Sequence, residues 1–206
     1  MQGYIVNINR TRDEDLIVTI LTEQNLETLY RFYGARHGSI NIGFKIDFEI
    51  EHSVKVNIAR LRDVIHIGFP WITEHHRLRI WQQFLKLFFS HLKDTQSLEP
   101  FYFNLIEKSA RLWEAQNPYR VAVEAYVTLL EFEGRLHKEA ICFFCEEKIT
   151  DDKISLIRAY LPAHYACAHT MPLNKKALDE LYCKHTSIFL DDNEIERLWY
   201  LLLEGL

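Results

Sequence analysis

The sequence has few of the residues that interrupt regular structure, with seven glycines and five prolines among 206 residues. This scarcity excludes collagen-like chains, low-complexity segments and flexible linkers, which depend on those residues. A membrane-spanning helix is not expected either, because no uninterrupted apolar run is longer than Leu198 to Leu203. Met1 is followed by neither a basic stretch nor a long apolar one, so no secretion signal is expected. We therefore expect a cytoplasmic protein, in which 48% apolar residues build a sizeable core.

An excess of positive charge is missing as well. The chain has 24 lysines and arginines against 29 acidic residues, which gives a formal net charge of −5. A net negative field repels the phosphates of nucleic acid, and no segment forms a polybasic tail. If nucleic acid is a partner, binding must therefore depend on a basic patch that forms in the folded protein.

The signature motifs of common enzymes are also absent. The sequence contains no H-E-x-x-H metal motif, no G-x-x-x-x-G-K-[ST] phosphate loop, no G-x-S-x-G nucleophile elbow and no G-x-G-x-x-G dinucleotide motif. The carboxylate pairs Asp151–Asp152 and Asp191–Asp192 adjoin expected turns or helix starts, where carboxylates serve as caps. We therefore expect no catalytic residues and predict that the protein is not an enzyme.

The first seventy residues show the pattern of β-strands. Between Ser39 and Glu51 apolar and polar residues alternate, which is typical of a strand with one buried face. Gly43 lies in the middle of this stretch, where a strand can bulge or bend. Four more strands are predicted, at residues 3–8, 16–22, 27–33 and 54–67, and polar turns separate them. Five short strands favour a small closed barrel made from a meander, of either OB type or SH3-like type.

Beyond Pro70 the apolar residues recur at steps of three and four, which predicts helices. Three helices are expected at about residues 73–93, after Ser97, and from Asn117–Pro118 to about Glu133, and together they would form a bundle. Asn174 and Asp191–Asp192 are expected to cap two closing helices. The predicted fold class is α+β, with an OB-type barrel domain at residues 1–70 and a helical domain at residues 71–206.

The most chemically informative feature is a pair of short motifs, Cys142-x2-Cys145 and His164-x2-Cys167. Two cysteines separated by two residues form a turn, called a knuckle, that offers two sulfurs to a tetrahedral zinc ion. The second motif follows after eighteen residues, a spacing typical of structural zinc sites. Four protein ligands leave no open coordination position, so the predicted single zinc ion is structural. Its segment, at about residues 140–170, is expected to have too little regular structure to hold itself together without metal.

Other assignments of the cysteines stay open at this stage. His169, Cys183 and His185 are alternative fourth ligands, and His164 is preferred because its spacing to Cys167 repeats that of the first pair. Without metal, the cysteines would be small core residues. A site with three protein ligands and water would instead indicate a metalloenzyme.

The order of these elements resembles the RecO family of recombination mediators. The resemblance rests on the strand at the N-terminus, the cysteine motifs and four segments: Arg12–Thr22, Tyr33–His37, Ser39–Glu51 and Leu130–Gly134. The resemblance covers nearly the whole chain. Within the family, the chain is similar to a compact, divergent branch such as that of epsilon-proteobacteria. The chain departs from the family pattern in two ways. The segment after the third strand is less basic than usual, and the second motif is H-x2-C where many members have C-x2-C.

The resemblance implies a DNA repair protein that acts by binding. Such a protein binds single- and double-stranded DNA, anneals complementary strands and, with RecR, loads RecA onto single strands coated by the single-strand-binding protein SSB. It also binds the C-terminal tail of SSB through its helical region. We expect a monomer when it is alone, no membrane partner, and association with the nucleoid when it acts on DNA.

An OB barrel binds DNA through cations that follow the phosphates and aromatic side chains on which bases stack. We predict that Tyr33 stacks on a base, whereas Tyr30 and Phe32 have the opposite parity on the strand and belong to the core. The predicted DNA contacts are Arg10, Arg12, Arg31, Tyr33, Arg36, His37 and Lys45. The alternative is a protein-interaction adaptor with little intrinsic DNA binding, which the acidic net charge favours.

Overall fold

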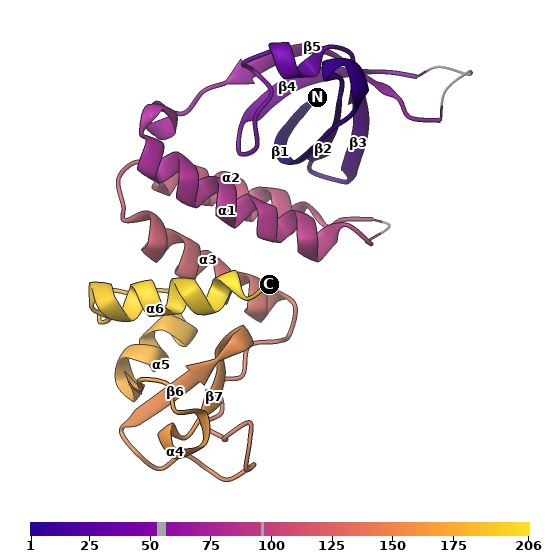
Figure 1. The fold of residues 1–206 in the computed structure, drawn as a ribbon. Coiled ribbons are helices and arrows are strands. Elements are labelled where there is room, and N and C mark those ends of the chain that lie inside the picture. Colours follow the sequence, from indigo (N-terminus) through magenta and orange to yellow (C-terminus); the bar gives the residue numbers. More distant parts are fainter. Residues whose placement is uncertain (53–56, 96) are drawn as a thin grey trace. The chain divides into compact units, whose positions relative to one another are not determined.

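The computed structural model describes residues 1–52, 57–95 and 97–206, except for the side chain of Arg12. The chain forms two compact units, Met1–Glu114 and Ala115–Leu206 (Figure 1). This division differs from the predicted boundary at residue 70, because the two helices that follow the barrel pack against it. Within the described ranges, no helix is long and apolar enough to cross a membrane.

The first unit begins with a closed barrel of five strands. They are β1 (Gln2–Arg10), β2 (Leu16–Leu21), β3 (Leu26–Arg31), β4 (Lys45–Glu51) and β5 (Arg60–Ile67). Their order is β1-β2-β3-β5-β4, and β4 pairs with β1 to close the barrel. Neighbouring strands are antiparallel except β3 and β5, which are parallel. The barrel is therefore not a simple meander, and its Greek-key order confirms the OB type.

The barrel closes around apolar side chains at alternate positions of its strands. Leu16, Val18 and Ile20 of β2 are buried, as predicted, and pack in one cluster with Ile46 and Phe48 of β4. Burial of each such side chain contributes about 1.5–3 kcal/mol. Because successive side chains of a strand point to opposite faces, this burial also fixes which residues face outward.

The strand predicted over Ser39–Glu51 is shorter than its alternation suggests, since β4 begins only at Lys45. Gly43, just before it, has a φ of +90°, and a Cβ there would lie 2.8 Å from Cδ1 of Trp81. The chain therefore turns at Gly43, where only glycine fits both the conformation and the close approach. The last predicted strand also begins later than expected, at Arg60, while residues 54 and 56 lie outside the described part of the chain.

Two helices, α1 (His75–Leu92) and α2 (Pro100–Leu112), follow the barrel in the first unit (Figure 1). The ring of Trp81 on α1 contacts Tyr4 of β1, with centroids 6.0 Å apart, and Trp113, with centroids 4.9 Å apart. Its indole Nε1 donates a hydrogen bond of 2.8 Å to the carbonyl of Gly43. Barrel and helices thus share one aromatic core, which explains why the unit extends past residue 70.

A buried polar contact also joins α2 to the barrel. The Glu107 carboxylate accepts hydrogen bonds from the Tyr4 hydroxyl, at 2.7 Å, and from the Lys45 ammonium, at 2.9 Å. Burial alone raises the pKa of Glu107, but hydrogen bonds from Lys45, Tyr4 and Arg111 outweigh it, so the pKa is lowered. The carboxylate is therefore charged, and it holds the charge of Lys45 in a position that is only 8% exposed.

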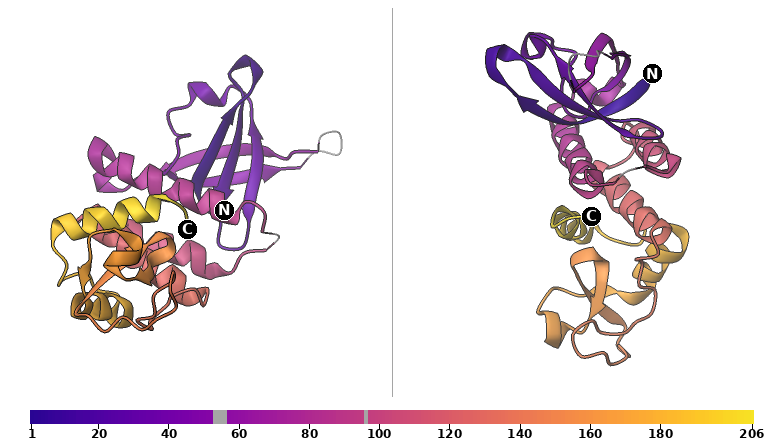
Figure 2. Two further views of the ribbon diagram at one scale, coloured as in Figure 1. Left: turned by 60° about the horizontal axis from the view of Figure 1, so that its bottom comes forward. Right: turned by 90° about the vertical axis from the view of Figure 1, so that its right-hand side faces the viewer.

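The second unit combines helices with a small sheet (Figure 2). Its elements are α3 (Pro118–Phe132), β6 (Lys153–Ile157), β7 (Leu161–Ala163), α4 (Tyr165–Ala168), β8 (Leu173–Asn174), α5 (Lys175–Lys184) and α6 (Asp192–Leu203). The strands form a sheet in the order β7-β6-β8, so part of the segment at residues 140–170 has regular structure. The prediction that the first three helices form one bundle is wrong, because α3 belongs to this unit and contacts α5 and α6.

The helix caps of this unit are those expected from the sequence. Asn117 and Asn174 each accept a hydrogen bond from a backbone N–H in the first turn, of α3 and α5 respectively. Asp191 forms a capping box with Glu194 at the start of α6. Each cap contributes about 1 kcal/mol, so local sequence alone locates these helix starts.

Candidate metal centre and nucleic-acid interface

Four predicted metal ligands come together in the second unit. The ligand atoms of Cys142, Cys145, His164 and Cys167 all lie within 4.8 Å of one another. With Zn–S bonds of about 2.3 Å, the sulfurs of a tetrahedral zinc site lie roughly 3.8 Å apart. Small side-chain adjustments therefore bring these four atoms around one ion, and the three-cysteine, one-histidine set is consistent with zinc.

Two turns hold the ligands in place. The first contains Cys142 and Cys145 and is closed by an antiparallel bridge between Ile141 and Lys148. The second follows β7, where His164 precedes α4 and Cys167 lies within that helix. The backbone N–H of Phe143 donates to the carbonyl of Pro162 at 2.9 Å, which ties the first turn to β7. Pairing between the first turn and β7 thus brings together two motifs that eighteen residues separate in the sequence.

The surroundings of the group favour the thiolate form of Cys142 and disfavour that of Cys167. Desolvation raises the pKa of Cys142, but backbone N–H groups of His164, Cys145 and Phe144 outweigh it and lower the pKa to about 6. Desolvation and the neighbouring Cys142 and Cys145 raise the pKa of Cys167 to about 11. Because metal ions bind thiolates, a cation at the centre of the group would relieve this repulsion.

The alternative fourth ligands lie elsewhere in the second unit. The Nε2 atom of His185 pairs with the Glu131 carboxylate at 2.7 Å. His169 follows α4 in a left-handed conformation, with its ring edge-on to Tyr165, and Cys183 is exposed. None of the three belongs to the group of four ligand atoms, so His164 is the fourth member, as predicted.

Several of the predicted DNA contacts gather at one end of the barrel. Leu16 of β2 pairs with both Arg10 of β1 and Arg31 of β3, so the two arginines lie on neighbouring strand ends. Arg36 ends a short 3-10 helix that follows β3, and Arg60 starts β5 opposite Tyr30. Strand register therefore assembles a cationic rim from positions spread over fifty residues.

Two aromatic side chains are exposed on this rim. Phe32 and Tyr33 are 47% and 54% exposed. The guanidinium carbon of Arg60 lies 5.0 Å from the centroid of Phe32, and that of Arg36 lies 5.2 Å from the centroid of Tyr33. We call these four residues the aromatic–arginine rim. Exposed rings beside guanidinium groups are typical of surfaces on which nucleobases stack.

The placement of Phe32 in the core was a wrong prediction. β3 ends at Arg31, and Tyr33 takes a left-handed conformation with a φ of 48°, in which its N–H donates to Asp15. Leu29 is the β3 residue that faces the barrel core. Tyr30 and Phe32 therefore share the outward face of the strand, with ring centroids 5.0 Å apart, and the core placement of the half-buried Tyr30 was wrong as well. Sequence reasoning missed both Phe32 and Arg60. The dipeptide Tyr33-Gly34 was the available signal for a turn, since glycine after an apolar stretch often ends a strand.

Lys45 needs a second correction, because the structure buries it at the other end of the barrel. It pairs in register with Tyr4 and Ile67, and its ammonium is bound by Glu107. A cationic trough running from Arg31 and Arg36 to Lys45 therefore does not form.

The remaining predicted DNA contacts differ in exposure and in whether the side chain already has a partner. Arg31 is half-buried and donates to the Leu61 carbonyl, whereas Arg36 is exposed and pairs with Glu14. Arg10 and His37 are exposed, and the side chain of Arg12 lies outside the described structure. Some of the cations at this end of the barrel are thus already paired with carboxylates or carbonyls, which lowers the net positive charge of the surface.

Fold and sites together define an OB-barrel protein whose second unit holds a three-cysteine, one-histidine group close enough to bind a metal ion. Residues 1–72 match the family model described as RecO N terminal. The match confirms the resemblance to the RecO family and supports a general role in DNA repair or recombination. The comparison with curated proteins found no match.

Proposed function

We propose that this protein is a non-enzymatic recombination mediator that binds single- and double-stranded DNA and anneals complementary strands. With RecR it would promote RecA loading onto single strands coated by SSB, whose C-terminal tail it would also bind, in the cytoplasm. The match of residues 1–72 to the RecO N-terminal domain supports this role. The observation that carries the proposal is the aromatic–arginine rim at one end of that barrel.

In this proposal the rim handles the strand in two ways. Phe32 and Tyr33 stack on bases, while Arg36 and Arg60, together with Arg10 on the neighbouring end of β1, contact phosphates. Binding must displace Glu14 from Arg36 and Glu51 from Arg60, which reduces the net gain from each contact. The resulting modest affinity suits a protein that must release its strand to a partner.

The Cys142, Cys145, His164 and Cys167 group would hold one structural zinc ion. The donor set and the spacing of its atoms support this assignment. When bound, zinc supplies folding energy by linking two turns that are far apart in sequence. The four residues fill its coordination sphere, so this site would have no catalytic role.

The replacement of Phe32 by alanine tests the rim. Loss of one stacked base costs about 1–3 kcal/mol, so we expect single-stranded DNA to bind at least about fivefold more weakly. Fluorescence anisotropy with a labelled oligonucleotide, at low and moderate salt, measures the effect. The Arg60→Gln variant should reduce the salt slope by about 0.7, the value for one phosphate contact on a single strand.

The matched control is Phe189→Ala, which removes an exposed phenylalanine from the second unit and should leave the affinity unchanged. If the unmodified protein shows no salt-sensitive binding, the adaptor alternative is correct and the DNA proposal fails. Annealing of SSB-coated complementary strands, with and without RecR, then tests the mediator activity itself.

A further inference from the structure

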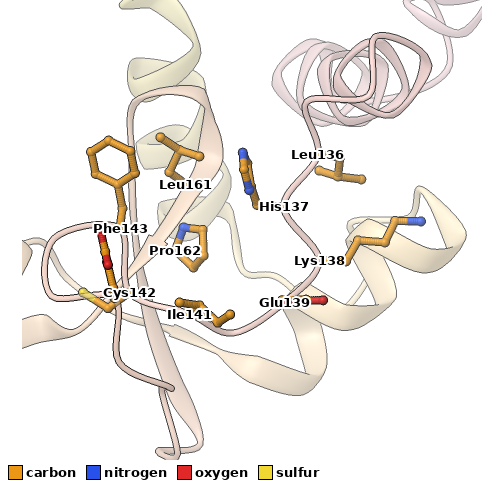
Figure 3. Close-up of a pocket in the computed structure, with 10 residues that line it drawn as sticks. Leu136, His137, Lys138, Glu139, Ile141, Cys142, Phe143, Leu161 and Pro162 are labelled. Carbon is orange, nitrogen blue, oxygen red and sulfur yellow. The ribbon is translucent and has the colours of Figure 1, made fainter.

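A second feature of the metal-binding unit is a pocket beside the first cysteine turn (Figure 3). Its volume is about 620 Å³, within the range of pockets that bind ligands or peptide side chains. Leu136, Ile141, Phe143 and Leu161 supply apolar surface, and Glu139 and Glu146 supply negative charge. We call this the knuckle pocket. The DNA proposal makes no use of it.

The cysteine turn pushes apolar residues outward beside this pocket. Because both sulfurs of the turn face the metal position, the two residues between them must point away from it. These residues are Phe143 and Phe144, which are 58% and 55% exposed and contact each other with centroids 5.8 Å apart. Polar residues would serve the turn equally well, so two exposed phenylalanines indicate a surface that a partner covers.

The charges around the pocket select the kind of partner. Among the described residues, the carboxylates of Glu139, Glu146 and Glu147 form no ion pair or side-chain hydrogen bond. Lys138, the lysine among the lining residues, is already bound by Glu131 at 2.6 Å. The surface is therefore acidic and apolar, which disfavours nucleic acid and favours a ligand with positive charge beside an apolar group.

The backbone at the pocket wall fits an extended peptide. Residues 136–139 form no helix or strand, and they line the side of the pocket opposite Phe143 (Figure 3). In the described chain, the N–H groups of His137 and Lys138 donate to no protein acceptor. An extended peptide can accept hydrogen bonds from such groups while its side chains enter the pocket.

We infer that the knuckle pocket, with Phe143 and Phe144, binds a protein segment in which a large apolar side chain is flanked by lysine or arginine. Glu139 and Glu146 receive the cations, and the apolar side chain lies against Phe143. The intact metal centre holds this face in shape, because the same turn carries Cys142 and Cys145.

Selection from a displayed library of random twelve-residue peptides on the full-length, metal-loaded protein tests the inference. Enriched peptides should combine lysine or arginine with a large apolar residue. In anisotropy measurements the enriched peptide should bind the Phe143→Ser/Phe144→Ser variant at least about tenfold more weakly, or about 1.4 kcal/mol. It should bind the Ile188→Ser/Phe189→Ser control, another exposed apolar pair, as it binds the unmodified protein.

A charge-reversal variant keeps the inference testable if the serine variant folds poorly. Glu139→Lys/Glu146→Lys should lose the basic peptide and accept a matched peptide with glutamate in place of each lysine and arginine. Metal content and melting temperature of both variants, measured in parallel, identify folded protein. The inference is overturned if no peptide is enriched, if enriched peptides carry no cationic bias, or if the serine variant loses single-stranded DNA instead.

Discussion

The Cys145→Ser variant is expected to lose its metal and to unfold the second unit at a much lower temperature than the unmodified protein. Structural zinc contributes roughly 10–16 kcal/mol in small zinc-binding domains, and the loss of one of four ligands removes a large part of this energy. The turn that carries Cys142 and Cys145 would then be held by the Ile141–Lys148 bridge and by backbone hydrogen bonds, such as the one from Phe143 to Pro162, without a metal to link it to His164 and Cys167. Metal analysis and thermal unfolding measure both effects, and a strong zinc chelator should reproduce them.

The matched control is Cys183→Ser, because Cys183 is exposed and lies outside the ligand group. It should keep one metal ion per chain and the original melting temperature. DNA affinity should change little in either variant, since the rim lies in the first unit. A Cys145→Ser protein that melts normally but no longer binds DNA would contradict the structural role of the metal.

The Glu107→Ala variant is expected to destabilise the first unit by about 3 kcal/mol. Removing one partner of a buried ion pair leaves an uncompensated charge and typically costs about 3–5 kcal/mol. The side chains of Lys45 and Glu107 are only 10% and 17% exposed, so the Lys45 ammonium would be left with little water and no counter-charge. The value lies at the lower end of the range because the Tyr4 and Phe103 rings, each 5.9 Å away, still stabilise the cation. Denaturant unfolding provides the measurement.

The double variant Glu107→Leu/Lys45→Met separates the effect of the buried charges on stability from the effect of side-chain packing. It removes both charges while keeping apolar volume, and should recover most of the lost stability. If Glu107→Ala were as stable as the unmodified protein, Lys45 would not depend on the carboxylate.

The same pair predicts a pH dependence of the first unit. The pKa of Glu107 is lower in the folded protein than its ordinary value of 4.5. Its contribution to stability is therefore present above pH 4.5 and is lost as the pH falls through the lower, folded-state pKa. The acid branch of the stability curve should be shallower in the double variant, and unfolding measured from pH 6 to pH 2 would show the difference.

Local sequence determined much of this protein. Alternation of apolar residues located the strands, because one face of each strand must be buried, and it placed Leu16, Val18 and Ile20 correctly in the core. Asn117, Asn174 and Asp191 located helix starts, because a capping side chain bonds to N–H groups only two or three residues away. The four residues of the candidate metal site could also be identified from the sequence, since the x2 spacing of each pair is a local property of a turn.

The tertiary structure decided whatever depends on partners distant in sequence. Lys45 looked like a free surface cation until α2 brought Glu107 to it, sixty-two residues later in the chain. Phe32 looked like a core residue, but barrel closure turned Leu29 inward and left Phe32 on the outer face of the strand. There β5 placed Arg60 over its ring. The first compact unit extends past the predicted boundary at residue 70 for the same reason, because Trp81 of α1 packs against Tyr4 of the barrel and against Trp113. Side-chain periodicity reports which face of an element is apolar, but only the packing of elements determines what covers that face and which charges meet.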